Sequence, residues 1–235
     1  MAKSVLVTGF EPFGGDKVNP SEIVTRSMEG RLIAGRPIST HVFPVETRAL
    51  RERFEALLIG DLPDLIVALG QSGGRASIAL ERVAVNVLDF TSADNVGVMR
   101  KNDQIARDGP EARISNLPFE SILEAWHENG VPGYVSNTAG TFVCNQALYE
   151  LLALTEHAAQ PVLVGLVHLP YLPLQAIAAG SEGNPSMSFE TMKKGVELLV
   201  ETVVGWMEHR TPEASRARTQ GHSMWIPRGL KEVER

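Results

Sequence analysis

The chain holds a single cysteine, Cys144, at a place where a helix is expected to begin. The small and polar residues 136–140 precede it and an apolar segment with helical period follows, so Gly140 or Thr141 is the expected N-cap. Unpaired backbone N–H groups and the helix dipole favour a thiolate in that first turn and could hold an oxyanion. A free cysteine is also commonly an inert buried residue, so local sequence leaves its role open.

Among the six histidines, His168 has the position best suited to chemistry. It comes directly after the apolar run 162–167, and Pro170 and Pro173 are expected to keep a helix from starting there. The carboxyl end of a central strand is where α/β sheets hold their ligands, although a structural role stays open on position alone. No two histidines have the spacing of a helical zinc site, and one cysteine builds neither a thiolate cage nor an internal disulfide, so we expect no metal.

Glu81 is the candidate partner for that imidazole. It lies in the strand-like run 78–88, where alternation places it on the apolar face with Ala79 and Val83. A carboxylate buried there needs a partner, and the choice is between a salt bridge with Arg75 and a histidine N–H. A histidine partner would fix the imidazole tautomer and stabilise the imidazolium, as in catalytic triads.

The loop at residues 9–15 has the glycine spacing of a phosphate-binding loop but not its chemistry. Gly14 is followed by Gly15 and Asp16 instead of lysine and a hydroxyl residue, and the dinucleotide fingerprint is absent. The loop instead carries Phe10 and Phe13. These rings either close the edge of the core or wall an apolar pocket for a small flat ligand.

The elements that would position these residues alternate along the chain. Strands are expected at residues 4–8, 38–42, 65–69, 78–88, 134–135 and 162–167, and helices at 21–32, 46–59, 119–128, 141–154 and 189–208. This alternation predicts a single three-layer α/β/α domain with a mostly parallel twisted sheet covered by helices on both faces. The domain is expected to span residues 1–210, with a long loop at 95–118 and a C-terminal tail at 211–235.

Composition narrows the classes of partner. The 235 residues are 43% hydrophobic and 21% charged, which is ordinary for a globular chain whose core needs no disulfides. The net charge of −6 argues against non-specific affinity for nucleic acid or an anionic membrane. No apolar run approaches the roughly 18 residues of a membrane span, and none resembles the core of a signal peptide. We therefore expect a cytoplasmic protein without nucleic acid or membrane partners.

Four segments together resemble the pyroglutamyl peptidase I family, the cytosolic cysteine peptidases that remove an N-terminal pyroglutamyl residue. The segments are 9–15 with 19–21, 81–86, 136–145 and 168–173, and the resemblance covers residues 5 to about 208. It implies that Cys144 is the nucleophile, His168 the general base and then acid, and Glu81 the residue that orients His168. It further implies a lactam pocket made of Phe10, Phe13, Phe142 and Val143, with Gln71 near the polar edge of the lactam.

The resemblance also implies pyroglutamyl peptides as partners, no cofactor and a homotetramer or dimer. Thr91 stands where known members tend to carry an arginine near the reacting carbonyl, and Asp16 and Val45 replace other residues expected to shape the pocket. Two alternatives therefore stay open. One is a catalytically weak lactam- or nucleoside-binding protein on the same scaffold, and the other is a cysteine hydrolase for another small amide or ester.

Overall fold

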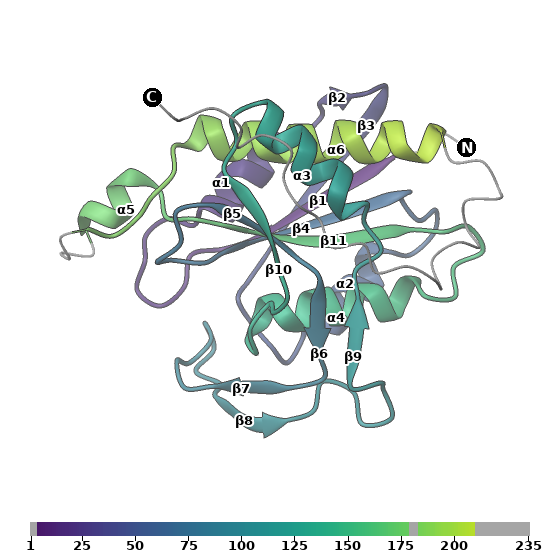
Figure 1. Cartoon of the computed structure of the whole chain (residues 1–235). Helices are drawn as coiled ribbons and strands as arrows, with labels where there is room; N and C mark the ends of the chain where they lie inside the picture. The colour runs from purple at the N-terminus through teal and green to yellow at the C-terminus, as the bar shows by residue number, and fades with distance from the viewer. Residues whose placement is uncertain (1–3, 179–182, 210–235) are drawn as a thin grey trace, which may run out of the picture.

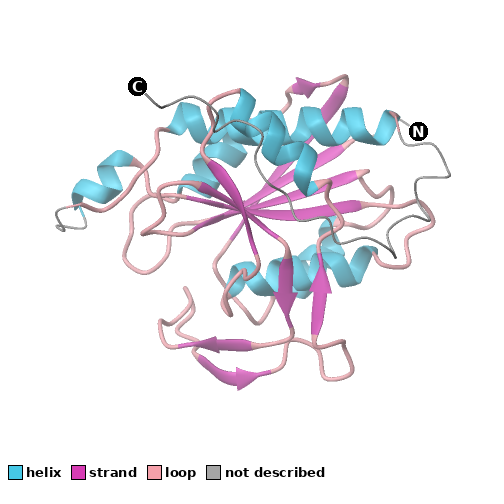
Figure 2. Cartoon of the chain, viewed as in Figure 1, coloured by secondary structure: helices cyan, strands magenta, loops and turns pink. Residues whose placement is uncertain are grey.

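A seven-stranded sheet forms the centre of the molecule (Figures 1 and 2). The computed structural model describes residues 4–178 and 183–209, so the predicted tail lies outside the described residues. In spatial order the strands are β10 (Gly133–Ser136), β5 (Ile78–Glu81), β11 (Leu163–Leu169), β4 (Leu65–Gln71), β1 (Val5–Phe10), β3 (Arg36–Phe43) and β2 (Leu32–Ile33). Neighbours pair in parallel except β5 with β11 and β2 with β3, which confirms the prediction of a mostly parallel sheet.

Helices cover both faces of this sheet, as Figure 1 shows. The helices on one face are α1 (Pro20–Ser27), α3 (Phe119–Glu128) and α6 (Phe189–Glu208), and those on the other are α2 (Leu50–Leu57) and α4 (Val143–Thr155). A short helix, α5 (Pro173–Ala178), lies beyond the edge of the layers. The predicted three-layer α/β architecture is therefore confirmed. Within the described residues, no helix has the length and apolar character needed to cross a bilayer.

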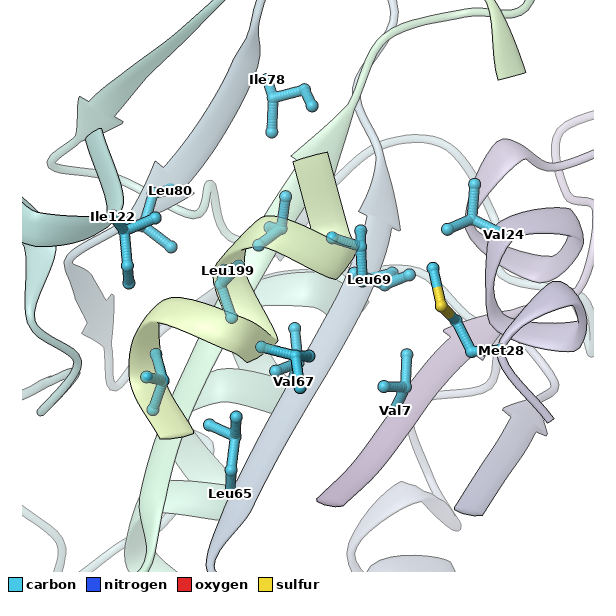
Figure 3. Packing of buried hydrophobic residues seen from close by; sticks show 14 of the residues in the cluster. Val7, Val24, Met28, Leu65, Val67, Leu69, Ile78, Leu80, Ile122 and Leu199 are labelled. Carbon is cyan, nitrogen blue, oxygen red and sulfur yellow. The ribbon is translucent and has the colours of Figure 1, made fainter. Parts of the chain in front are cut away.

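The two faces bury separate apolar clusters. In Figure 3, Val7, Val67 and Leu69 of the sheet pack with Met28, the C-cap of α1, and with Leu199 of α6. A second cluster joins the opposite face of the sheet to α2 and α4. Each fully buried aliphatic side chain contributes about 1.5–3 kcal/mol, so the two clusters hold the strand ends in place.

The predicted strand at 78–88 was wrong in extent. It is divided into β5, β6 (Val83–Val85) and β7 (Leu88–Phe90), and the chain leaves the central sheet at Arg82. β6 pairs with β9 (Ala112–Ile114) and β7 pairs with β8 (Arg100–Asp103), so the segment predicted as a long loop contains two strands. β8 has only polar side chains and β9 spans only three residues, so neither offers an apolar pattern long enough for a strand to be detected.

The helix predictions were correct at α3 and α6 and differed at several other ends. The helix expected at 21–32 ends at Ser27, because Gly30 adopts a φ of 66° and residues 32–33 form β2. α2 starts at Leu50 instead of residue 46. The expectation that Pro173 prevents a helix was wrong, since α5 begins at this residue. Proline fits a first helical turn because its missing N–H would have no partner there.

Candidate active site

Cys144 is the second residue of α4, in the first turn as expected. The predicted caps Gly140 and Thr141 were wrong, because the N-cap is Phe142 with extended backbone (φ −107°, ψ −159°). Thr141 stays outside the helix because its hydroxyl donates to the Asp89 carbonyl at 2.6 Å and its own carbonyl accepts from the Asp89 N–H at 3.1 Å. Phe142 has no side-chain acceptor, so no side chain caps the N–H groups beside Cys144.

The next residue, Asn145, attaches this helix start to β6. Its Oδ1 accepts from the Val85 N–H at 2.8 Å, and its Nδ2 donates to the carbonyls of Val85 and Val87 at 2.9 and 3.0 Å. The side chain is fully buried, so these bonds replace those it would make to water. Sequence reasoning assigned Asn145 no role, although a polar residue in an apolar helix is a detectable signal.

His168 lies inside β11 and not directly after a strand, which corrects the expected position. In the sheet it pairs with Gly70 of β4 on one side and Ala79 of β5 on the other. A Cβ on Gly70 would lie 2.6 Å from the Cys144 Sγ and 3.3 Å from the His168 Nε2. The thiol and the imidazole therefore meet over a position where only glycine leaves room, a packing role that sequence reasoning did not assign to Gly70.

Glu81 ends β5 and reaches the imidazole through antiparallel pairing. It lies opposite Leu166, two residues before His168, so the two side chains are diagonal neighbours on one face. Its Oε1 is 2.7 Å from the His168 Nδ1 and 3.0 Å from the Arg75 Nη1. Sequence reasoning left Arg75 and a histidine as alternative partners, and the structure places both at this fully buried carboxylate. The expectation that Val83 continues the same face was wrong, because the strand ends at Glu81.

The charges around His168 favour its protonated form. Burial by itself lowers its pKa, but attraction to a Cys144 thiolate, hydrogen bonding to that sulfur and the bond to Glu81 together raise the pKa to about 9. The imidazolium thus lies between a sulfur and a carboxylate. This arrangement suits a residue that gives and takes a proton during nucleophilic attack by a thiolate.

A cavity of about 180 Å³ opens beside Cys144 and His168. Its lining includes all five residues expected in the pocket: Phe10, Phe13, Gln71, Phe142 and Val143. The ring centroids of Phe13 and Phe142 lie 6.0 Å apart, and those of Phe90 and Phe142 lie 4.5 Å apart. Phe10 combines the two roles left open for it, because it is buried against Phe43 and also faces the cavity.

The amide of Gln71 is held by a polar network at the cavity. Its Nε2 donates to the Asp16 carboxylate at 3.0 Å, and its Oε1 accepts from the Gln175 Nε2 at 2.9 Å. The same Gln175 Nε2 contacts the Val18 carbonyl at 3.1 Å, which connects α5 to the loop after β1. Sequence reasoning had assigned no role to Gln175. The bonds from Gln175 and to Asp16 fix the orientation of the Gln71 amide before a ligand binds.

The positions that depart from the resemblance occupy different places. Val45 is buried and lines the cavity. Thr91 is exposed and is not one of the lining residues, whereas a different residue, Arg75, supplies an arginine to the lining. Gly140, with a φ of 78°, turns the chain between β10 and the helix start and also lines the cavity.

A thiol at a helix start, an imidazole and a buried carboxylate beside a small cavity form the arrangement typical of cysteine peptidases and related thiol hydrolases. Here they sit on a mostly parallel α/β sheet. The chain belongs to the pyroglutamyl peptidase family, whose model matches residues 3–205.

Individual relatives agree with this membership. The chain is 42% identical over 201 residues to pyrrolidone-carboxylate peptidase 1 of Ralstonia nicotianae, covering 86% of this chain and 93% of the relative. It is 40% identical to pyrrolidone-carboxylate peptidase of Thermococcus onnurineus, covering 84% and 97%. The solved structure of a mutant pyrrolidone carboxyl peptidase from Pyrococcus furiosus matches with a TM-score of 0.83 at 35% identity, covering 87% of this chain and 99% of that one.

Proposed function

We propose that this chain hydrolyses the amide bond after an N-terminal pyroglutamyl residue of peptides, with Cys144, His168 and Glu81 as its catalytic residues. The observation that carries the proposal is the meeting of Cys144 and His168 at one small, aromatic-lined cavity. The names of the relatives, pyrrolidone-carboxylate peptidases, support the same substrate class.

The Cys144 thiolate attacks the carbonyl carbon of the scissile amide. The uncapped N–H groups at the start of α4 hold the oxyanion that forms. His168, protonated at rest, gives its proton to the leaving amine, and a thioester remains on Cys144. Neutral His168 then removes a proton from water, which attacks the thioester and releases pyroglutamate. Glu81 accepts the Nδ1 hydrogen bond throughout and keeps Nε2 directed at the sulfur.

The cavity suits an uncharged lactam. Phe13 and Phe142 offer apolar faces to the ring, and Gln71 offers amide groups to its polar edge. An uncyclised N-terminal glutamate would bring an ammonium and a carboxylate into this small space. The ammonium would also meet the cationic His168 and Arg75, so the site discriminates against it.

The cellular location, partners and oligomeric state of the protein are proposed from its charge and its exposed side chains. We expect a cytoplasmic protein without a nucleic acid partner, which a net charge of −6 favours. We also expect a homodimer or homotetramer. Leu174 and Ile177 on α5 are 77% and 75% exposed, and exposed apolar side chains of this size are typical of subunit contacts. Light scattering tests this: a monomer at working concentration contradicts it.

The test of the function is release of a fluorescent amine from its pyroglutamyl conjugate. We expect turnover by the wild type and losses of at least about 10³-fold for Cys144→Ser and His168→Ala. His157→Ala is the matched control, because that imidazole is exposed and does not line the cavity. Near-normal turnover by either site variant overturns the catalytic assignment. Turnover of glutaminyl but not pyroglutamyl conjugates overturns the substrate.

A further inference from the structure

A second cavity, of about 510 Å³, lies among the start of α2, the helix α4 and the segment around β8. It shares α4 with the catalytic cavity but not its lining residues. Cys144 faces the first cavity, whereas Gln146 and Glu150, on the following turns, line the second. Its volume is within the range of small-molecule sites. No step of the proposed reaction uses it.

The floor of this cavity has two buried oxygen atoms without donors. Gln146 and Glu150 are only 4% and 3% exposed. The Gln146 Nε2 donates to the Thr47 carbonyl at 2.9 Å and to the Glu150 Oε1 at 3.0 Å, so flipping the amide would set oxygen against oxygen. Among the described residues, the Gln146 Oε1 and the Glu150 Oε2 have no hydrogen-bond partner. A group with N–H donors would satisfy both.

The walls of the cavity offer the opposite chemistry. Four arginines line it, and two of them, Arg48 and Arg107, form no ion pair within the part of the chain that the structure describes. Arg100 is paired with Asp103 at 3.2 Å, yet its buried Nε has no acceptor there. A carboxylate would pair with these guanidinium groups, which bind planar anions well.

Two apolar residues and the polar residues Thr47, Glu52, Asp103 and Gln104 complete the lining. Leu88 is buried at the end nearest β7 and Ile105 is partly buried in the loop after β8. We propose that this cavity binds a free α-amino acid with an apolar side chain. Its ammonium meets the Glu150 Oε2 and the Gln146 Oε1, its carboxylate meets the arginines, and its side chain packs on Leu88 and Ile105. The binding needs no catalysis and does not depend on the proposed reaction.

Calorimetry with L-leucine and two truncated probes tests the chemistry of the ligand. Leucinamide lacks the carboxylate and 4-methylpentanoate lacks the ammonium. We expect L-leucine to bind the wild-type chain with a Kd of about 1 mM or tighter, and each truncated probe at least about tenfold more weakly. Absence of L-leucine binding overturns the proposal. Equal binding of 4-methylpentanoate overturns it as well, because the floor would then have no role.

Variants place the binding in this cavity. Glu150→Gln preserves size and removes the charge on the floor, and Arg107→Gln removes an exposed guanidinium from the wall. We expect each variant to bind L-leucine at least about tenfold more weakly than the wild-type chain. The matched control is Arg53→Gln on α2, which loses an ion pair with Glu46 but does not line the cavity. Unchanged affinity in Arg107→Gln contradicts the site even if Glu150→Gln fails to fold.

Discussion

One buried glutamate, Glu81, lies behind His168 at the catalytic cavity, and another, Glu150, lines the second cavity on α4; the two carboxyl groups differ in their partners. Glu81 is fully buried and lies within 3.0 Å of the nitrogens of His168 and Arg75. Glu150 is nearly as buried but receives its hydrogen bond from the neutral amide of Gln146. Burial therefore raises the pKa of Glu150 to about 7, an effect that the Gln146 bond and Arg51 only partly oppose.

This difference shows that the partners of a buried carboxyl decide its chemistry. Glu81 pairs with two basic side chains, His168 and Arg75. With an amide and a more distant arginine, Glu150 changes its charge near neutral pH. The first arrangement suits a fixed role in each catalytic cycle. The second suits a group that responds to what enters its cavity.

The strongest test of the comparison removes the charge of Glu81. Glu81→Gln preserves size but gives the imidazole a neutral partner, so we expect kcat/KM to fall by about 10³–10⁴-fold. Glu156→Gln is the control, because that carboxylate ends α4 and pairs with Arg113 at the surface, 2.8 Å away. The measurement is steady-state turnover of a pyroglutamyl conjugate. A loss no larger than that of the control would show that the charge of Glu81 is not needed.

The pH dependence of stability tests Glu150. The folded chain keeps this proton to about pH 7, whereas an unfolded glutamate releases it near 4.5. Because the folded state binds this proton more tightly, the free energy of unfolding includes an extra contribution of up to about 3 kcal/mol below pH 4.5. This contribution is lost as pH rises through about 7. Glu150→Gln should flatten this decline in urea unfolding between about pH 5 and about pH 8. An equal decline in both proteins contradicts the assignment.

The close packing of the catalytic cavity is tested at Gly70. In Gly70→Ala the new methyl group would lie 2.6 Å from the Cys144 Sγ, so the sulfur or the imidazole must move. We expect a loss of about 10² in kcat with the fold retained, because displacement of about 1 Å has this cost in a positioned site. Gly205→Ala in α6 is the control, since nothing lies within 4 Å of its added carbon. Normal kcat in Gly70→Ala would show that the site tolerates displacement.

The smallest expected effect is a decline of kcat/KM at alkaline pH. Deprotonation of His168 removes the acid that protonates the leaving amine, so kcat/KM should fall about tenfold per pH unit above its pKa of about 9. In Glu81→Gln this decline should begin at lower pH, because the bond to Glu81 helps to raise the pKa of His168. Constant activity above about pH 9, or a decline at the same pH in the variant, would show that the His168–Glu81 pair does not set the pH dependence.

The elements could be predicted wherever their side chains carried an apolar pattern. α3 and α6 have clear helical period, and their bounds were predicted correctly. β8 was missed because its side chains are polar, and β9 because three residues are too few for an apolar pattern to be recognised. The start of α4 was misplaced because backbone and hydroxyl bonds between Thr141 and Asp89, 52 residues away in sequence, hold the chain outside the helix.

The sequence by itself determined the chemistry available to this protein: one thiol at the start of a helix, an imidazole on a central strand and a carboxylate among apolar residues. Only the tertiary structure decided which groups meet. Antiparallel pairing of β5 with β11 sets Glu81 diagonally from His168, and Gly70 leaves space for the sulfur. Gln146 and Glu150 likewise form a cavity floor only because α2 and the β7–β8 hairpin pack around them. Strand register and side-chain packing bring together residues that are far apart in the chain. Both depend on the energy of the whole fold, and a local sequence pattern does not reveal them.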